Sequence, residues 1–439
     1  MISLRAPRLA EKLSLCAIAL VLLGAALLAQ PGVSDGASRP LGVVSQTDPS
    51  EAEFEAMRRG GVGTYRWLVS WPSLQPSADA PPDWSATDRI VASLARNDIQ
   101  PLPMIQGSPC FVVDCSRIPP ARAHNRPPLD SPQARRAWSG FLGELVGRYG
   151  PDGAFWSANP AVPYRPIGVW QIWNEQNAPK FYAPSPSVEG YAELLAISSQ
   201  AIRSRDPEAQ ILLGGMFGDP KEPGSIEAPR FLDELYGMRG AKRHFDGVAA
   251  HPYSRDVAGV ERQMLDIRRV IEANGDAETP IWVTELGWGS GDGPRGRLIV
   301  TPAGQAQRLG EAFGLFMARR DDWNLASALW FAWRDTSNPN VCDWCRTAGL
   351  ISEDGQAKSS WSTYAELSGG RPVAPADIPG PGGPTPSPGP PPGDGEPSSD
   401  AGPPVLLLIA GALALAAAAG AWIMRRRRAG DPEPRRDEL

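Results

Sequence analysis

The sequence predicts an α/β protein whose main domain is a (β/α)8 TIM barrel, followed by a Pro-rich stalk and one C-terminal transmembrane helix. Eight short apolar runs alternate with amphipathic stretches between residues 41 and 368, and strands that are separated by helices pair in parallel. A doubly wound open sheet is the competing topology, but the turn after the first run, Gln46-Thr47-Asp48-Pro49, is not glycine-rich. After residue 370 the chain becomes proline-rich and then continuously apolar.

The predicted strands and helices follow one another in eight units. We expect the strands at residues 41–44, 64–69, 101–105, 167–172, 211–214, 247–250, 281–284 and 327–331. We expect the helices that follow them at residues 51–59, 86–96, 132–149, 188–205, 230–236, 260–273, 302–319 and 360–367. Ser50 and Glu53 form a capping box at the start of the first helix, and Pro132 occupies the favoured first position of the third. Eight units in about 330 residues fit one barrel.

The N-terminal residues 1–30 are typical of a secretory signal peptide or of an uncleaved signal anchor. The basic residues Arg5, Arg8 and Lys12 precede an apolar run at residues 13–28, and Ala29 follows at a cleavage position. We therefore expect the barrel domain to occupy residues 31–370.

The C-terminal residues predict a membrane anchor on a stalk. Residues 371–404 contain 13 prolines in 34 positions, a composition that gives an extended spacer and no packed core. Residues 405–424 are apolar and uncharged, and a helix of this length crosses a bilayer. Arg425–Arg428 come next, so the positive-inside rule places the tail, residues 425–439, in the cytoplasm. The prediction is a single-pass protein of the cell membrane, with the lipid bilayer as a partner and the barrel outside the cell.

The composition argues against several classes of function. A formal net charge of −6 disfavours a nucleic-acid binder, and three histidines leave little material for a His-rich metal site. The sequence contains no Gly-x-Ser-x-Gly elbow, no Walker loop and no repeat array. We therefore expect no metal and no cofactor, and the sequence indicates no particular oligomeric state.

The five cysteines agree with export from the cytoplasm. Cys16 lies in the signal segment, and the other four form two close pairs, Cys110/Cys115 and Cys342/Cys345. A four-thiolate zinc site is an alternative, but the two spacings lack zinc-ribbon surroundings. Three disulfide pairings are possible, and in an oxidising compartment we expect two local bridges near the barrel mouth, each within one close pair.

Two of the predicted strands end on a glutamate. The fourth ends in Trp-Asn-Glu at Glu175, and the seventh ends in Thr-Glu-Leu-Gly-Trp with its glutamate at Glu285. The carboxyl ends of barrel strands meet at one mouth, where the chemistry is found. A lone glutamate at a strand end is usually solvated, whereas two across a mouth suit glycosidic bond cleavage, with one protonated and the other ionised. A metal site, the other use of two glutamates, lacks a supporting His or Asp in either segment.

Other strand ends supply candidate substrate-binding residues. Arg66, within the second apolar run, is placed to hold a carboxylate ionised, and His251 and Tyr253 close the sixth strand. Because the flat faces of indole rings stack on the C–H faces of sugars, four tryptophans at the predicted mouth are candidate sugar contacts: Trp71, Trp288, Trp333 and Trp344. Three tryptophans well inside strands are expected to pack in the core: Trp170, Trp282 and Trp330.

These motifs resemble the acid/base and nucleophile signatures of clan A glycoside hydrolases. The pattern Trp173-Asn174-Glu175-x-Asn177, with Thr-Glu-Leu-Gly-Trp at 284–288, is most similar to family 39 and more loosely to family 5. The resemblance covers residues 41–368, and Gln176 stands where the family commonly has a proline.

The resemblance implies a role for each matching residue. It makes Glu175 the acid/base, Glu285 the nucleophile and Asn174 the residue that binds the sugar 2-hydroxyl. It also implies that residues of the second and sixth strands surround the nucleophile, here Arg66, His251 and Tyr253.

The expected function is a membrane-anchored extracellular glycoside hydrolase that cleaves O-glycosidic bonds of a polysaccharide or oligosaccharide by a retaining double displacement. Two alternatives stay open at this point. A catalytically silent carbohydrate-binding barrel on the same stalk needs the sugar contacts but not both glutamates. An adhesion or structural surface protein needs neither glutamate.

Overall fold

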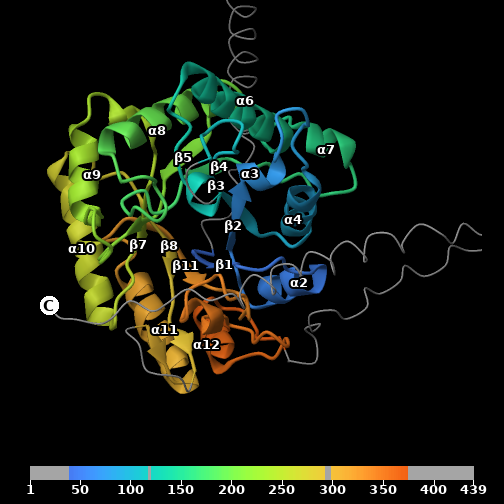
Figure 1. Ribbon diagram of the computed structural model, residues 1–439. Coiled ribbons are helices and arrows are strands. Elements are labelled where there is room, and N and C mark those ends of the chain that lie inside the picture. Colours follow the sequence, from blue (N-terminus) through green and yellow to red (C-terminus); the bar gives the residue numbers. More distant parts are fainter. Residues whose placement is uncertain (1–38, 117–119, 292–297, 374–439) are drawn as a thin grey trace, which may run out of the picture. The chain divides into compact units, whose positions relative to one another are not determined.

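The computed structural model describes residues 39–116, 120–291 and 298–373 of the chain. Over these residues nine strands form one parallel sheet in the order β5-β4-β3-β2-β1-β11-β8-β7-β6. A further parallel bridge pairs Leu212 of β5 with Gly247, which directly precedes β7. The amide of Leu213 donates to the carbonyl oxygen of Gly247 at 3.1 Å. This bridge joins β5, at one end of the sheet, to the start of β7, which lies next to β6 at the other end, so the strands close into a barrel with the helices around it (Figure 1).

The strands lie where the apolar runs predict them. They are β1 Leu41–Val44, β2 Thr64–Ser70, β3 Gln100–Gln106, β4 Val169–Ile172, β5 Gln210–Leu213, β6 Met216–Phe217, β7 Val248–His251, β8 Ile281–Leu286 and β11 Leu325–Phe331. Gly214 and Gly215 separate β5 from β6, which together occupy the fifth position of the barrel. The predicted parallel α/β barrel is therefore confirmed. The sequence did not predict the short sheet of β9 Gly289–Ser290 and β10 Ile299–Val300.

The outer layer consists of the predicted helices. They are α2 Glu51–Arg59, α4 Ser85–Arg96, α6 Pro132–Tyr149, α8 Val188–Arg203, α9 Ala228–Gly237, α10 Val257–Ala273, α11 Pro302–Ala318 and α12 Ser359–Leu367. Helix α2 starts with the predicted capping box, because Ser50 accepts from the amide of Glu53 and Glu53 accepts in return. Shorter turns connect the elements: α3 Trp71–Leu74, α5 Pro120–Ala123, α7 Ala154–Ala158, and the 3-10 turns η2 Ala241–His244 and η3 Cys345–Thr347.

Side chains alternate between two apolar layers along each strand, as the period of two requires. The barrel interior is filled by Val44, Leu102, Val169, Leu212, Ala249, Trp282 and Leu329. The layer between strands and helices contains the opposite faces of the same strands, including Trp170 and Trp330. The core positions predicted for Trp170, Trp282 and Trp330 are thus confirmed, since all three are buried.

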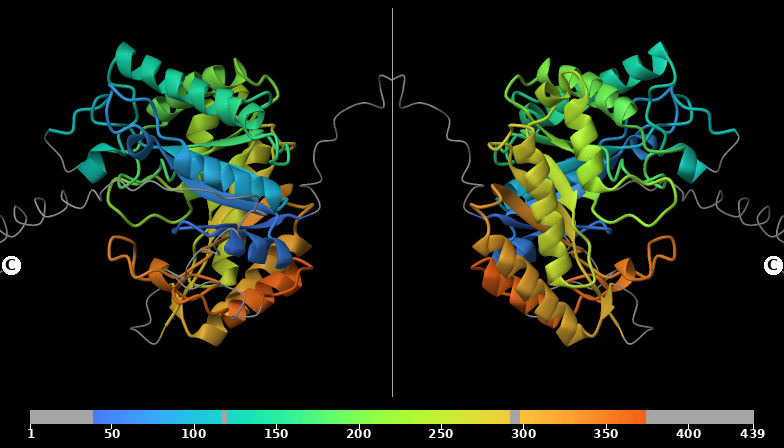
Figure 2. Two further views of the ribbon diagram at one scale, coloured as in Figure 1. Left: turned by 90° about the vertical axis from the view of Figure 1, so that its right-hand side faces the viewer. Right: turned by 90° about the vertical axis from the view of Figure 1, so that its left-hand side faces the viewer.

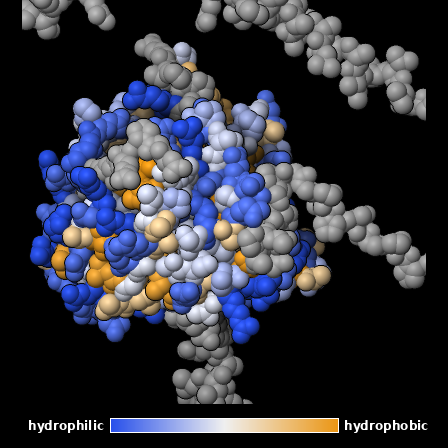
Figure 3. Space-filling view, turned by 90° about the horizontal axis from the view of Figure 1, so that it is seen from below, coloured by the Kyte–Doolittle hydropathy of each residue, from blue (hydrophilic) through white to orange (hydrophobic). Residues whose placement is uncertain are grey.

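Helices cover the barrel on all the sides that the figures show. In the two side views of Figure 2, α2 and α4 cover one side of the strands, and α9 and α10 cover the opposite side. Figure 3 shows hydrophilic residues along the rim of the lower face, with hydrophobic residues in smaller groups between them. This distribution fits helices that bury one stripe and expose the other.

Several predicted segments lie outside the described residues. They are the signal at 1–30, the stalk beyond residue 373, the transmembrane run at 405–424 and the tail at 425–439. Within the described ranges, none of the helices combines the length and the apolar character that a membrane span requires.

Candidate active site

Four strands bring the predicted charged residues together at the carboxyl end of the barrel. Arg66 lies in β2, His251 ends β7, Glu285 lies in β8, and Glu175 follows β4 by three residues. All four side chains are buried, and the two glutamates are 7% and 8% exposed. One carboxylate oxygen of each glutamate and a ring nitrogen of His251 lie within 4.8 Å of one another. The residues that the sequence selected from distant strands therefore form one cluster.

Arg66 is the centre of the positive charge in this cluster. It occupies the interior face of β2, in register with the apolar Val44 of β1 and Leu102 of β3. Its Nη1 donates to Glu285 Oε1 at 2.5 Å, and its Nη2 donates to Asn174 Oδ1 at 2.7 Å. The planar guanidinium thus orients both Glu285, the candidate nucleophile, and Asn174, the candidate sugar-binding residue.

Glu285 is surrounded by groups that favour its ionised form. Tyr253 Oη donates to Glu285 Oε2 at 2.9 Å. Burial alone would raise the pKa of Glu285, but the positive charge that His251 carries whenever its ring is protonated, and the positive charge of Arg66, oppose it. Together with the hydrogen bonds from Arg66 and Tyr253, they hold the pKa of this carboxyl below its usual range. Glu285 is therefore suited to remain a carboxylate.

Glu175 has fewer hydrogen-bond donors around it than Glu285, and its pKa is shifted in the opposite direction. Burial raises the pKa of Glu175, and the nearby negative charge of Glu285 adds to this. The hydrogen bond of His251 opposes the rise, as does the charge of its ring whenever the ring is protonated. Its polar partner is Nδ1 of His251, 2.9 Å from Oε1. Glu175 is therefore suited to hold a proton at a pH at which Glu285 has lost its own.

The backbone after β4 is bent to aim Glu175 into the cluster. Trp173 and Glu175 adopt left-handed conformations with φ of 71° and 43°, which are uncommon for residues with a side chain and cost free energy. The Glu175 amide donates to the Gly215 carbonyl at 2.9 Å. Gly215 must lack a side chain, because a Cβ there would collide with the imidazole of His251.

Two buried polar residues of the site were missed by the sequence prediction, Gln171 and Thr284. Arg66 Nε donates to Gln171 Oε1 at 2.5 Å, and Gln171 Nε2 lies 3.3 Å from Thr284 Oγ1. Thr284 Oγ1 in turn lies 3.0 Å from His251 Nε2. The alternation of strand residues could have found both, since Gln171 follows Val169 by two positions and Thr284 follows Trp282 by two.

The carboxylates and the imidazole also have the chemistry of a cation site. The guanidinium of Arg66, however, already contacts a Glu285 oxygen at 2.5 Å and puts a positive charge beside it. A second cation at the same oxygens is disfavoured by that charge. A second cluster, Cys110, Cys115 and His124, is not a zinc site because its two thiols are joined in a disulfide.

Three of the predicted sugar-stacking tryptophans are instead structural. Trp71, Trp288 and Trp333 are 1%, 0% and 0% exposed. Their indole N–H groups donate to acceptors of the protein itself, which are Gln75 Oε1, the Ser254 carbonyl and Glu53 Oε1. With both ring faces covered by protein, they offer no surface to a sugar. The sugar contacts predicted for these three residues are therefore wrong, because a position after a strand does not decide which way the ring turns.

Trp344 differs from the other three because it remains partly exposed. Its ring centroid lies 5.0 Å from that of Tyr253 and 5.6 Å from that of Phe331. Leu68, two positions after Arg66 on the interior face of β2, is 51% exposed and was not predicted. These two side chains add apolar surface near the charged cluster.

Both predicted disulfides are present. Cys110–Cys115 lies in the loop after β3, and Cys342–Cys345 lies in the loop after β11. Their Cα atoms are 5.4 Å and 5.0 Å apart, within the ordinary range for a bridge. The second bridge encloses Trp344.

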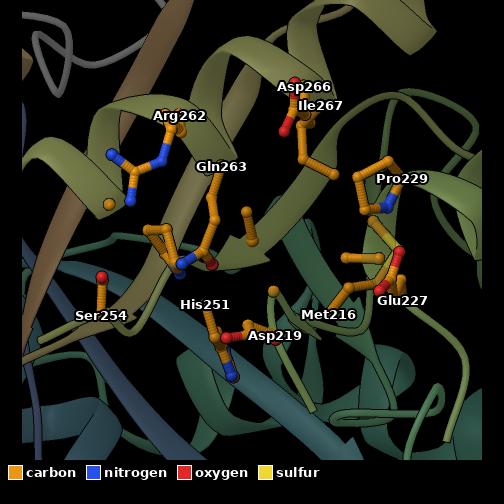
Figure 4. Close-up of a pocket in the computed structure, with 15 residues that line it drawn as sticks. Met216, Asp219, Glu227, Pro229, His251, Ser254, Arg262, Gln263, Asp266 and Ile267 are labelled. Atoms are coloured by element: carbon orange, nitrogen blue, oxygen red, sulfur yellow. The ribbon is translucent and has the colours of Figure 1, made fainter. Parts of the chain in front are cut away.

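A cavity of about 320 Å³ adjoins the cluster on the outer side of β7. Figure 4 shows that Arg262 and Gln263 of α10 face Met216 and Glu227 across it, with His251 nearby. The described residues that line this cavity do not include Glu175 or Glu285. The cavity therefore meets the cluster at His251 and not at the two carboxylates.

The comparisons with known proteins concern the fold. No family model matches the chain, and no curated protein matches it. Solved structures of family 39 and family 5 glycoside hydrolases do match it over the barrel.

A family 39 glycoside hydrolase from Bacteroides cellulosilyticus shares 18% identity, with a TM-score of 0.56 over 76% of this chain and 64% of that one. A monomeric β-xylosidase from Caulobacter crescentus shares 17% identity, with a TM-score of 0.55 over 75% of this chain and 67% of that one. A GH5_18 protein from Bifidobacterium longum, in complex with Manβ1-4GlcNAc, shares 16% identity, with a TM-score of 0.53 over 75% and 78%. The chain thus spans about two thirds of the length of the first two, and at these identities the likeness establishes the barrel fold.

Proposed function

We propose that the protein is a glycoside hydrolase that cleaves O-glycosidic bonds by a retaining double displacement. One observation carries the proposal: two buried carboxyl groups with opposite pKa shifts, Glu175 raised and Glu285 lowered, have oxygens within 4.8 Å. Retaining enzymes have carboxyl groups about 5–5.5 Å apart, whereas inverting enzymes leave roughly 6.5–9.5 Å for a water. An approach of their nearest oxygens to within 4.8 Å favours the shorter of these two separations and so supports the retaining route.

In the first step a Glu285 oxygen attacks the anomeric carbon. The bond from that carbon to the leaving oxygen breaks, and the proton of Glu175 passes to the leaving oxygen. This step uses Glu285 as a carboxylate and Glu175 as an acid, which are the forms that their surroundings favour. A covalent glycosyl-enzyme and a free leaving group result.

In the second step Glu175 acts as a base. It takes a proton from a water molecule, the water oxygen attacks the anomeric carbon, and the bond to Glu285 breaks. The sugar leaves with its original anomeric configuration after two inversions. Arg66 and Tyr253 stabilise the departing carboxylate through the hydrogen bonds they donate to it.

The substrate that this site fits is a carbohydrate chain. Asn174, oriented by Arg66, is proposed to bind the sugar 2-hydroxyl beside the anomeric carbon. Trp344 is proposed to stack on a sugar face because it is the partly exposed indole of the four candidates. A polysaccharide or oligosaccharide agrees with the similar structures, one of which is named a β-xylosidase and another of which binds Manβ1-4GlcNAc.

The location of the protein is proposed from the sequence. The basic and apolar N-terminus, the prolines of 371–404 and the apolar run 405–424 support a barrel held outside the cell on a stalk. Protease treatment of intact cells tests this arrangement. The barrel should be released while the tail, residues 425–439, stays with the membrane, and a barrel protected in intact cells would contradict it.

Hydrolysis of a panel of aryl glycosides and polysaccharides by the full-length protein tests the activity. Turnover that disappears in Glu285→Ala is the expected result. If the wild-type protein binds a polysaccharide but does not hydrolyse any substrate of the panel, the protein is instead a silent carbohydrate-binding barrel.

A further inference from the structure

A buried chain of hydrogen bonds runs from Arg66 to His251 beneath the two carboxylates. Its members Gln171, Thr284 and His251 are all fully buried. It starts with the bond from Arg66 Nε to Gln171 Oε1, at 2.5 Å, and ends where His251 Nδ1 lies 2.9 Å from Glu175 Oε1. The groups at its start can act in one direction only, and this fixes the direction of every bond in the chain.

The orientation of the Gln171 amide follows from two contacts. The guanidinium of Arg66 can only donate, so the atom that faces it is the amide oxygen. The carbonyl oxygen of Leu213 can only accept, so the atom 3.0 Å from it is the amide nitrogen. The two contacts agree, and the other N–H of this nitrogen points to Thr284 Oγ1.

Thr284 accepts from Gln171, which leaves its own hydroxyl proton to be placed. Among the described residues, the partners of Thr284 Oγ1 are Gln171 Nε2 and His251 Nε2. If His251 Nε2 carried a proton, the threonine hydroxyl would be a buried donor without an acceptor, which is destabilising. The hydroxyl therefore donates, and His251 Nε2 accepts.

We propose that Gln171 and Thr284 are positioning residues that fix the neutral imidazole of His251 in its Nδ1–H tautomer. The Nδ1–H group then donates to Glu175 Oε1 at 2.9 Å. The tautomer of a histidine is set in this way by the hydrogen bond at its other nitrogen. The inference deepens the proposed function and rests on Glu175 as the acid/base.

This tautomer protects the proton that Glu175 must deliver. Because Nδ1 already carries a proton, the neutral ring has no lone pair there with which to take one from the carboxyl group. The catalytic proton of Glu175 is held on Oε2, the oxygen not bonded to His251. After this proton has moved to the leaving oxygen, the same Nδ1–H stabilises the carboxylate. In the opposite tautomer, the bare Nδ1 would compete with the leaving oxygen for the proton.

Nuclear magnetic resonance of the full-length protein labelled with 15N-histidine tests the proposal directly. The chain has three histidines. The signals that disappear in a His251→Gln variant are those of His251. At a pH at which the ring is neutral, we expect His251 of the wild-type protein as the Nδ1–H tautomer. We expect a mixture of tautomers in Thr284→Val, which removes the hydroxyl at similar volume, and a return to Nδ1–H in Thr284→Ser.

Kinetics give a second readout. Thr284→Val should lower kcat about tenfold, a part of the 10²–10⁴ that general acid catalysis contributes, with KM unchanged. The alkaline limb of the pH profile should move to higher pH, because a ring that no longer donates from Nδ1 stops stabilising the Glu175 carboxylate and the pKa of Glu175 rises. The other groups that act on this pair are Glu285, Arg66, Tyr253 and Lys180, and none of them is altered.

The matched control is Thr279→Val. Thr279 is also buried and donates to Asp276 Oδ2 at 2.6 Å, but it precedes β8 at the far end of the barrel. This variant should change neither the His251 tautomer nor the pH profile, whereas Thr284→Ser should recover both.

Two results would overturn the proposal: an Nε2–H tautomer of His251 in the wild-type protein, or a folded Thr284→Val with unchanged tautomer and kcat. If Thr284→Val does not fold, the wild-type spectrum and Thr284→Ser decide the question. A wild-type protein with the Nδ1–H tautomer but no hydrolysis would contradict the proposed function and leave the tautomer assignment standing.

Discussion

The ends of β4 and β8 present the same side chain to one mouth and give it opposite properties. At β8, Glu285 receives hydrogen bonds from Arg66 and Tyr253, and its pKa is lowered. At β4, the side chain of Glu175 has His251 as its hydrogen-bond partner among the described residues, and its pKa is raised by burial. The exposed fractions, 7% and 8%, are nearly equal. Depth of burial therefore does not distinguish the two carboxyl groups, whereas the donors and charges around each of them do.

Loss of the β8 carboxylate should have the largest effect. Glu285→Ala removes the group that forms the covalent intermediate, so we expect turnover to fall by about 10⁴-fold or more for every substrate. The rate of hydrolysis of an aryl glycoside measures this. Glu144→Ala, an exposed position on α6, is the control and should keep wild-type activity. Unchanged activity in Glu285→Ala would remove β8 from the chemistry.

Loss of the β4 carboxyl group should be less severe and depend on the substrate. Glu175→Ala removes the proton donor, so we expect roughly 10²–10⁴-fold slower cleavage of poor leaving groups. For substrates whose leaving group needs no proton, the rate of the first step, which forms the glycosyl-enzyme, should fall much less. Added azide should then raise turnover by attacking the glycosyl-enzyme, and a glycosyl azide of retained configuration is the product to detect. Equal losses for good and poor leaving groups would contradict the assignment.

Removal of one hydrogen-bond donor from Glu285 should bring its pKa closer to that of Glu175. Tyr253→Phe deletes a hydrogen bond to ionised Glu285, so the pKa of Glu285 should rise and activity should be lost at the acid side first. The acid limb of the pH profile therefore moves to higher pH, while the alkaline limb, set by Glu175, stays. We expect about a tenfold lower rate at low pH. A shift of the alkaline limb instead would reverse the two roles.

The smallest effects should separate sugar-binding from structural tryptophans. Trp344→Ala should raise KM by about two- to tenfold, since a stacked ring contributes about 0.5–1.5 kcal/mol. Trp333→Phe should leave KM unchanged and lower the free energy of unfolding by about 1–3 kcal/mol, because Glu53 loses a buried donor. Substrate titrations and chemical denaturation measure the two quantities. A higher KM in Trp333→Phe would show that Trp333 contacts the sugar after all.

Sequence patterns predicted the barrel because strand alternation and helix caps are local. They also selected Arg66, His251 and the two glutamates, since charged residues at the ends of apolar runs stand out. The orientation of Trp288 and Trp333 depends on acceptors far along the chain, such as Glu53 for Trp333. No local pattern reports such contacts, so these rings were misassigned.

The configuration of the first product tests the central claim most directly. Proton magnetic resonance, recorded from the start of hydrolysis by the full-length protein, reports the anomer released before mutarotation. The arrangement of Glu175 and Glu285 predicts that this anomer has the configuration of the substrate. An inverted anomer would contradict the covalent route through Glu285, because a single displacement by water inverts the centre.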